Sequence, residues 1–146
     1  YFYERAELRA QAGKFREAVI DYNAFYDAVS GDVTALFYFQ REQAEMQCRM
    51  YQQALNDINK AVEMAPEDVD FLVEKGSVHL RVNQLEEAVS VFRKALTMDD
   101  KYAAAYRMLG YCQALQNNTK EACANFAKAK ELGDEVVDQL IEKYCK

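Results

Sequence analysis

The chain has 146 residues, of which 51% are hydrophobic and 29% charged, and it contains one proline and five glycines. This is enough apolar material for a substantial core, and too few turn-forming residues for a β-rich or loop-rich fold. The formal charge of −6 and the pI near 4.9 argue against nucleic-acid binding and against binding to anionic membrane surfaces, because both need a basic face.

Apolar residues recur at i, i+3, i+4 and i+7 along the whole chain, and the alternation typical of β-strands is absent, so we expect an all-helical protein. Glycine, asparagine, aspartate and proline interrupt this pattern at short intervals. The segments between them predict helices at about 1–12, 15–29, 34–48, 51–64, 68–81, 85–97, 102–115, 119–131 and 135–144. No apolar run approaches the roughly 18 residues that a membrane span needs, so no membrane insertion is expected. Such short turns join antiparallel neighbours, so the helices should form hairpins.

Small residues return at a fixed interval in the second helix of each hairpin. Ala54, Ala88 and Ala122 are 34 residues apart, and so are Ala61, Ala95 and Ala129. A period of this length marks a solenoid of repeats. A divergent first repeat has Ala18 at the position of Ala54, Ala88 and Ala122. Each of these four alanines is followed four residues later by a large residue: Tyr22, Ile58, Phe92 and Phe126. Gly76 and Gly110 also recur 34 apart, which predicts a close approach of two helix backbones there.

These spacings carry a family resemblance. The segments concerned are Leu72-x2-Lys75-Gly76-x2-His79…Ala88-x3-Phe92 and Tyr106-x2-Leu109-Gly110-x2-Gln113…Ala122-x3-Phe126. They resemble the tetratricopeptide repeat (TPR) pattern W-x2-L-G-x2-Y…A-x3-F…P. The resemblance implies an all-α, TPR-type α-solenoid, a right-handed superhelix of antiparallel helix pairs with a C-terminal capping helix. The repeats would be at about 1–32, 35–68, 69–102 and 103–134, with the capping helix at about 135–144.

The chain departs from the TPR pattern in a few places. His79 and Gln113 stand where the pattern has tyrosine, and the Leu-Gly pair is altered by Arg41, Glu42 and Lys75. These departures predict atypical stacking of the second repeat. We interpret residues 1–146 as a single TPR array. Because the sequence begins abruptly within a helical pattern, we also expect it to be a fragment of a longer chain.

Motifs that carry chemistry are missing from the sequence. His79 is the single histidine, and packing against the adjacent helix is its expected role. The four cysteines show no CxxC spacing, and no phosphate-binding loop, G-x-S-x-G or H-E-x-x-H motif occurs. We therefore expect no enzyme activity, no catalytic or metal-binding residue and no cofactor.

The resemblance implies a non-catalytic protein–protein interaction module that binds a peptide or partner protein in a concave groove lined by the first helix of each hairpin. Carried over from the family geometry, the groove-lining residues would be Tyr3, Glu7, Phe39, Gln40, Gln43, Met46, Gln47, Asp70, Glu74, Ser77, Arg81, Arg107, Met108 and Tyr111, with Glu4 and Ala114 beside them. The aromatic triplets at 1–3 and 37–39 are equivalent in their repeats. We expect Phe2 and Tyr38 in the core, and Tyr3 and Phe39 side by side in the groove.

Other functions stay open at this point. The chain could be a structural or assembly domain of a larger protein whose groove is filled in cis, or an accessory domain of an enzyme. Some co-chaperone TPR domains grip a C-terminal carboxylate with lysine, asparagine and arginine. The matching positions here are Tyr3, Glu7, Gln40, Asp70 and Glu74, or in a second frame Phe39, Gln43, Glu74, Ala104 and Met108. Neither set supplies a basic clamp, so carboxylate-clamp binding of a chaperone is disfavoured.

Two cysteines meet in the repeat geometry that the resemblance implies. Cys123 would face the following helix, and Cys145 lies at the end of that helix, so a disulfide between them is possible. Two reduced thiols packed as small hydrophobic groups are the alternative. The tail also resembles the ends of TPR proteins from Bacteroidetes-type bacteria, often exported, and the location is open between exported and cytoplasmic.

Overall fold

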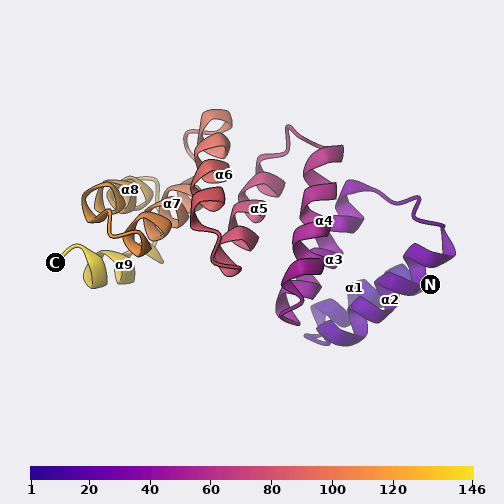
Figure 1. Cartoon of the computed structure of the whole chain (residues 1–146). Coiled ribbons are helices and arrows are strands. Elements are labelled where there is room, and N and C mark those ends of the chain that lie inside the picture. The colour runs from indigo at the N-terminus through magenta and orange to yellow at the C-terminus, as the bar shows by residue number, and fades with distance from the viewer. The chain divides into compact units, whose positions relative to one another are not determined.

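The computed structural model describes residues 1–146 and contains nine α-helices and no strand (Figure 1). They are α1 (Phe2–Gln11), α2 (Phe15–Ala28), α3 (Ala35–Gln47), α4 (Tyr51–Met64), α5 (Val69–Arg81), α6 (Leu85–Met98), α7 (Ala103–Leu115), α8 (Thr119–Glu131) and α9 (Val137–Tyr144). Every helix predicted from the sequence is present, and its ends lie within two residues of the prediction. None of these helices combines the length and the apolar character that a membrane crossing requires.

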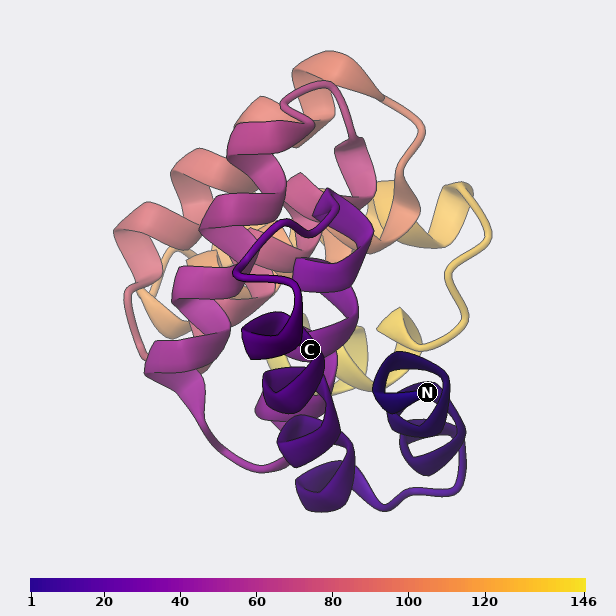
Figure 2. The same ribbon diagram turned by 90° about the vertical axis from the view of Figure 1, so that its right-hand side faces the viewer.

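The chain divides into two compact units. The first unit, Tyr1–Phe71, contains the hairpins α1–α2 and α3–α4 and the beginning of α5. The second unit, Leu72–Lys146, contains the rest of α5 and the helices α6 to α9, in which α7 packs against α6 and α8, and α9 packs against α8. Figure 2 shows α1 and α2 side by side, joined by their short turn.

One backbone position gives all four hairpins the same turn. Gly13, Arg49, Asn83 and Asn117 have φ angles of 76°, 59°, 62° and 64°, in the left-handed region. The backbone amide of the following residue donates to the carbonyl five positions earlier in the chain, for example Met50 N to Glu45 O at 2.9 Å. This bond satisfies a carbonyl group at the end of the first helix. The second helix then begins two residues after the left-handed residue. Glycine and asparagine suit this conformation, whereas in Arg49 it costs roughly 1–2 kcal/mol.

The repeated alanines lie where two helices cross. Ala18, Ala54, Ala88 and Ala122 are all completely buried, as are Ala61, Ala95 and Ala129. A Cβ atom on Gly76 would lie 2.5 Å from the ring of Phe92, and one on Gly110 would lie 2.8 Å from the ring of Phe126. The close approach of two helix backbones predicted at both glycines is seen at Gly110, where the backbone oxygen of Ala122 would also lie 3.0 Å from the added atom. At Gly76 the nearest atoms all belong to the ring of Phe92. In the second repeat Glu42 takes the glycine position, and there the opposing residue is the smaller Ile58.

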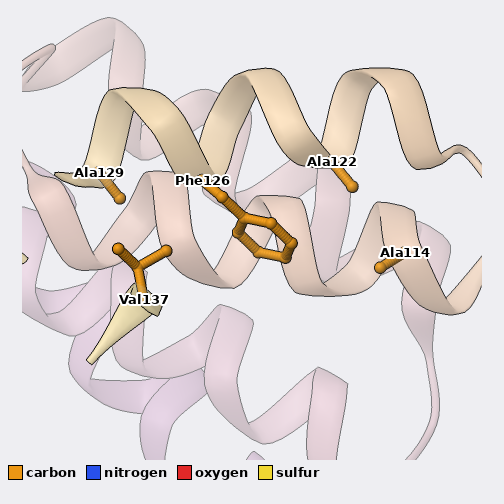
Figure 3. Packing of buried hydrophobic residues seen from close by; sticks show 5 residues of the cluster. All are labelled: Ala114, Ala122, Phe126, Ala129 and Val137. Carbon is orange, nitrogen blue, oxygen red and sulfur yellow. The ribbon is translucent and has the colours of Figure 1, made fainter. Parts of the chain in front are cut away.

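Figure 3 shows this packing in the second unit. Ala122, Phe126 and Ala129 project from α8, the ring of Phe126 lies against α7, and Val137 closes the cluster from the start of α9. Phe126, Ala129 and Val137 are completely buried. This cluster is therefore built by α7, α8 and α9 together.

Arg41, the departure from the TPR leucine, is held by a partner 16 residues later. Its Nε and Nη2 atoms donate to the two carboxylate oxygens of Asp57 at 2.6 and 2.8 Å. Its guanidinium also lies 4.8 Å from the ring centroid of Tyr26. Arg5 forms the same two-pronged pair with Asp21, 16 residues later. An arginine on the first helix is thus matched by an aspartate on the second, which stabilises a cation that would otherwise be costly to bury.

The first unit should lose stability as the pH rises. Burial, and next the negative charge of Asp57, raise the pKa of Glu45 from its ordinary value of 4.5 to about 8, against the opposing effect of Arg41. Between pH 4.5 and 8, Glu45 therefore keeps its proton in the folded unit and has lost it in the unfolded chain. The contribution of Glu45 to stability is fully present below this range and is lost through it, by at most about 1.4 kcal/mol per pH unit. Urea unfolding at several pH values should show this slope, and Glu45→Gln should remove it. A Glu45→Gln protein that keeps the slope would show that another group is responsible.

Candidate functional site

The second unit carries a pocket of about 300 Å³ between α5, α7 and the start of α9. Its walls are mostly apolar, and they consist of Leu80, Arg107, Met108, Tyr111, Val136, Gln139 and Leu140. The volume is at the lower end of the range of roughly 300–1,000 Å³ found for ligand pockets. The pocket therefore has room for one or two amino-acid side chains.

Helical spacing places these side chains together. On α7, Arg107, Met108 and Tyr111 lie within one turn and share a face, and Val136 and Leu140 are four residues apart at the start of α9. Asp134 fixes the two helices to each other. Its Oδ2 atom accepts from Nε of Arg107 at 2.7 Å, and its Oδ1 atom accepts from the backbone amide of Val137 at 3.1 Å. One carboxylate thus binds the first residue of α9 and holds this helix to α7.

The other end of α9 is attached to α8. Cys123 and Cys145 are bonded in the structure, with their Cα atoms 5.8 Å apart, inside the range that a disulfide requires. Next to the bond, the ring of Tyr144 lies 6.3 Å from that of Phe126 and 6.4 Å from that of Tyr111 in the pocket. The helix that forms one wall of the pocket is thus anchored at both of its ends.

Three of the groove residues predicted from the sequence come together in this pocket: Arg107, Met108 and Tyr111. Ser77 lies next to them, because its Oγ is 3.5 Å from Sδ of Met108, while Glu74 and Arg81 lie elsewhere on α5. Sequence reasoning missed the pocket residues Leu80, Val136, Gln139 and Leu140. The apolar i, i+4 pair at 136 and 140 was the available signal, but it was interpreted only as a capping helix.

Ala114 does not lie on a groove wall as expected. It is buried in the cluster around Phe126, because its face of α7 is turned towards α8 (Figure 3). The prediction for this residue was wrong.

In the first unit, the predicted groove residues form hydrogen bonds with one another. The hydroxyl of Tyr3 donates to the side-chain oxygen of Gln40, and Nε2 of Gln40 donates to Glu7 at 2.9 Å. The ring of Tyr3 lies 5.3 Å from that of Phe25, while the ring of Phe39 lies 5.0 Å from that of Phe71. Tyr3 and Phe39 are both half-buried, each beside a different aromatic neighbour. Of the other predicted residues here, Met46 is half-buried and three are exposed: Gln43, Gln47 and Asp70.

Phe2 lies outside the core, contrary to the prediction. It is 38% exposed, whereas its equivalent Tyr38 is only 9% exposed. Tyr38, on α3, is buried because Tyr26 of the preceding helix α2 packs on it. Phe2 lies on α1, and the structure has no helix before α1 to pack on it in the same way. Repeat equivalence alone does not give the burial of a residue in the first repeat.

Charge is divided unequally between the two units. The first unit holds 13 of the 24 acidic residues and 7 of the 18 lysines and arginines, whereas the second holds 11 of each kind. The whole formal charge of −6 therefore belongs to the first unit.

The structure contains no group of three or more His, Cys, Asp or Glu side chains that could hold a metal ion. Nδ1 of His79 lies 2.7 Å from Oε1 of Gln84, so the histidine contacts a neighbouring side chain in its own hairpin turn. Cys48 and Cys112 are free thiols, and burial raises the pKa of Cys112 to about 11, which keeps this thiol protonated and unreactive.

A family model described as tetratricopeptide repeat matches residues 43–102 and 74–135 of the chain. The chain belongs to the tetratricopeptide repeat family. The all-α, TPR-type solenoid predicted from the sequence is confirmed.

Several known proteins are similar to this TPR chain. Sperm-associated antigen 1 of Mus musculus is 29% identical over 127 residues, which are 87% of this chain and 14% of that protein. DnaJ homolog subfamily C member 7 of Homo sapiens is 24% identical over 82 residues, which are 56% of this chain and 17% of that protein. The TPR chain thus spans less than a fifth of the length of either relative.

Two solved TPR structures show the same fold. YrrB, described as a TPR protein with an unusual peptide-binding site, has a TM-score of 0.86 at 19% identity, over 97% of this chain and 73% of that one. The first TPR domain of Spaghetti (RPAP3), solved with the HSP90 peptide SRMEEVD, has a TM-score of 0.72 at 18% identity, over 77% of this chain and 90% of that one. At 19% and 18% identity, these two structures show the fold of the chain.

Proposed function

We propose that this TPR chain is a non-catalytic interaction module whose second unit binds an unstructured segment of a partner protein, with one apolar side chain of that segment inserted into the pocket. The observation that carries the proposal is the pocket itself. Leu80, Met108 and Leu140 provide apolar contact, and the half-buried Tyr111 combines a ring with a polar edge. Such residues are typical of interfaces and are costly to expose without a partner.

Polar groups at the rim suit the backbone that flanks such a side chain. Arg107 and Gln139 line the pocket beside its apolar wall, and an amide and a guanidinium can hydrogen-bond to peptide carbonyl groups. Arg107 is already oriented by Asp134 at 2.7 Å. A pocket that is formed before binding loses little conformational entropy on binding, which favours affinity.

Recognition of a C-terminal carboxylate is not part of this proposal. In the first unit, the positions that would form such a clamp include Tyr3, Glu7 and Gln40, which are joined to each other by hydrogen bonds. The unit also carries the whole net negative charge of the chain, which repels a carboxylate. A partner segment with an internal apolar anchor therefore fits the structure better than an acidic C-terminus.

The proposal is tested with peptides selected from a random display library on the wild-type chain. Their dissociation constants are then measured by fluorescence anisotropy for the wild type, Tyr111→Ala, Leu140→Ala and the control Leu36→Ala, an equally apolar and 51% exposed site in the first unit. We expect the two pocket variants to weaken binding by more than about 1 kcal/mol, roughly fivefold or more, and the control to leave it unchanged.

Two results would contradict the proposal. One is a set of selected peptides whose affinity is unaffected by both pocket variants, which would place their binding site elsewhere. The other concerns the peptide SRMEEVD: tight binding of the free acid, lost when its C-terminus is amidated, would show that the chain recognises a carboxylate. A fall in the melting temperature of Tyr111→Ala with unchanged affinity would assign Tyr111 to the core.

A further inference from the structure

The pocket of the second unit is lined by three groups that attract aromatic rings. Arg107, Met108 and Tyr111 lie close together on α7 and line the pocket together. A guanidinium is attracted to the face of a ring, a thioether sulfur packs favourably on a ring, and two rings attract each other through an edge and a face. All three attractions depend on the π-electrons of the guest, so an aliphatic side chain of the same size gains none of them.

The guanidinium of Arg107 is oriented before any partner binds. Its Nε atom donates to Oδ2 of Asp134 at 2.7 Å, and the Asp134 side chain is only 8% exposed. The hydrogen bonds of a guanidinium lie in its plane, so this bond orients the group without using its face. Arg41 shows the same chemistry in the first unit, because it donates to both carboxylate oxygens of Asp57 while its guanidinium lies 4.8 Å from the ring centroid of Tyr26. An arginine paired with aspartate can therefore still bind a ring.

The two other groups are also held by neighbours. Oγ of Ser77 on α5 lies 3.5 Å from Sδ of Met108. The ring of Tyr111 packs at 62° to the ring of Tyr144, with 6.4 Å between their centroids. A sulfur and a ring that are positioned in advance lose little conformational entropy when a guest enters, so their preference for a ring is expressed in the affinity.

The remaining walls do not discriminate between rings and aliphatic chains. They are formed mainly by Leu80 on α5 and by Val136 and Leu140 at the start of α9, which suit any apolar guest. The pocket volume of about 300 Å³ has room for a large aromatic side chain. Selectivity between an aromatic and an aliphatic guest therefore depends on the side chains of α7.

We infer that the pocket selects an aromatic side chain, that of phenylalanine, tyrosine or tryptophan, over an aliphatic one. The inference rests on the function proposed above, because it specifies the anchor residue of the partner segment. Arg107 and Met108 determine this selectivity, and Tyr111 contributes to it. The partner is accordingly a protein whose unstructured segment carries an exposed aromatic residue.

The test starts from a selected peptide whose binding is weakened by Leu140→Ala, so that its anchor lies in the pocket. An alanine scan of the peptide identifies the anchor position, at which we expect an aromatic residue. A peptide with phenylalanine at that position is then compared with one that carries cyclohexylalanine, which has a similar size, is at least as apolar and has no π-electrons. The change to cyclohexylalanine should weaken binding to the wild-type chain about fivefold or more.

Two conservative variants of the chain locate the selectivity. Met108→Leu keeps the side-chain volume and removes the sulfur, and Arg107→Lys keeps the charge and removes the planar group. Each should lower the ratio of the two dissociation constants about twofold or more, mainly by weakening the phenylalanine peptide. The matched control Met98→Leu, at a 40% exposed methionine that ends α6, should leave the ratio unchanged. A general loss of stability affects both peptides equally and does not change the ratio.

Three outcomes would overturn the inference while leaving the proposed function intact. They are equal affinities of the two peptides for the wild type, an aliphatic anchor in most of the selected peptides, and an unchanged ratio in both Met108→Leu and Arg107→Lys. Selected peptides that bind Tyr111→Ala and Leu140→Ala as tightly as the wild type would contradict the proposed function itself, and the inference with it.

Discussion

Phe126→Ala is expected to lower the free energy of unfolding of the second unit by about 3–5 kcal/mol. The ring is completely buried, lies against Gly110 on α7, and its centroid is 6.3 Å from that of the Tyr144 ring at the end of α9. Its removal leaves a cavity that α7, α8 and α9 all border, and none of these helices can close it alone. Urea unfolding followed by circular dichroism measures the loss.

The matched control for this substitution is Phe2→Ala. Phe2 is the same residue type but is 38% exposed, so its truncation removes less buried surface and should cost well under half as much. Equal losses at Phe2 and Phe126 would contradict the burial of the two rings in the structure.

Cys145→Ser should destabilise the second unit by about 3 kcal/mol, because the bond to Cys123 closes a loop of 22 residues in the unfolded chain. Dithiothreitol should have the same effect on the wild type and no effect on the variant. Because α9 supplies Val136, Gln139 and Leu140 to the pocket, the peptides selected for the pocket should also bind the variant more weakly. Hydrogen exchange of the α9 amides should become faster in the variant.

The control for this prediction is Cys48→Ser, which removes a free thiol in the first unit and should affect neither α9 nor the pocket. Thiol titration of the denatured, unreduced protein should find two reactive groups, those of Cys48 and Cys112. Four reactive thiols would show that Cys123 and Cys145 are not bonded.

Local patterns predicted the helices and their ends, because the apolar period and the Gly, Asn and Asp breaks act within a few residues. Gly13, Asn83 and Asn117 are of the residue types that favour the left-handed turn, so three of the four hairpin turns carry this signal in the sequence, whereas Arg49 does not. The closely packed glycines were also predictable, because Gly76 and Gly110 repeat in step with Phe92 and Phe126.

Contacts between residues distant in sequence were not predictable in the same way. The pairing of Arg41 with Asp57 depends on how two helices cross, so the arginine could only be recorded as a departure from the TPR pattern. The pocket wall formed by α9 was not predicted. Its position depends on hydrogen bonds that Asp134 accepts from Arg107 and from the first turn of α9, and these contacts do not recur in the other repeats, so no periodic pattern in the sequence indicates them. The exposure of Phe2 was missed for a further reason. Repeat equivalence predicts that Phe2 is buried like Tyr38, but Tyr38 is buried by Tyr26 of the preceding helix α2, a contact that Phe2 lacks in the structure.

The unequal distribution of charge affects how fast partners are captured. A basic segment is attracted by the first unit over about 10 Å at an ionic strength of 0.1 M, and its association rate with that unit falls as salt is added. The second unit has equal numbers of acidic and basic residues, so its net charge provides no such attraction. We expect the segment proposed for the pocket to associate at a rate nearly independent of salt. Added salt should therefore weaken the attraction of a basic molecule to the first unit and leave the second unit unaffected.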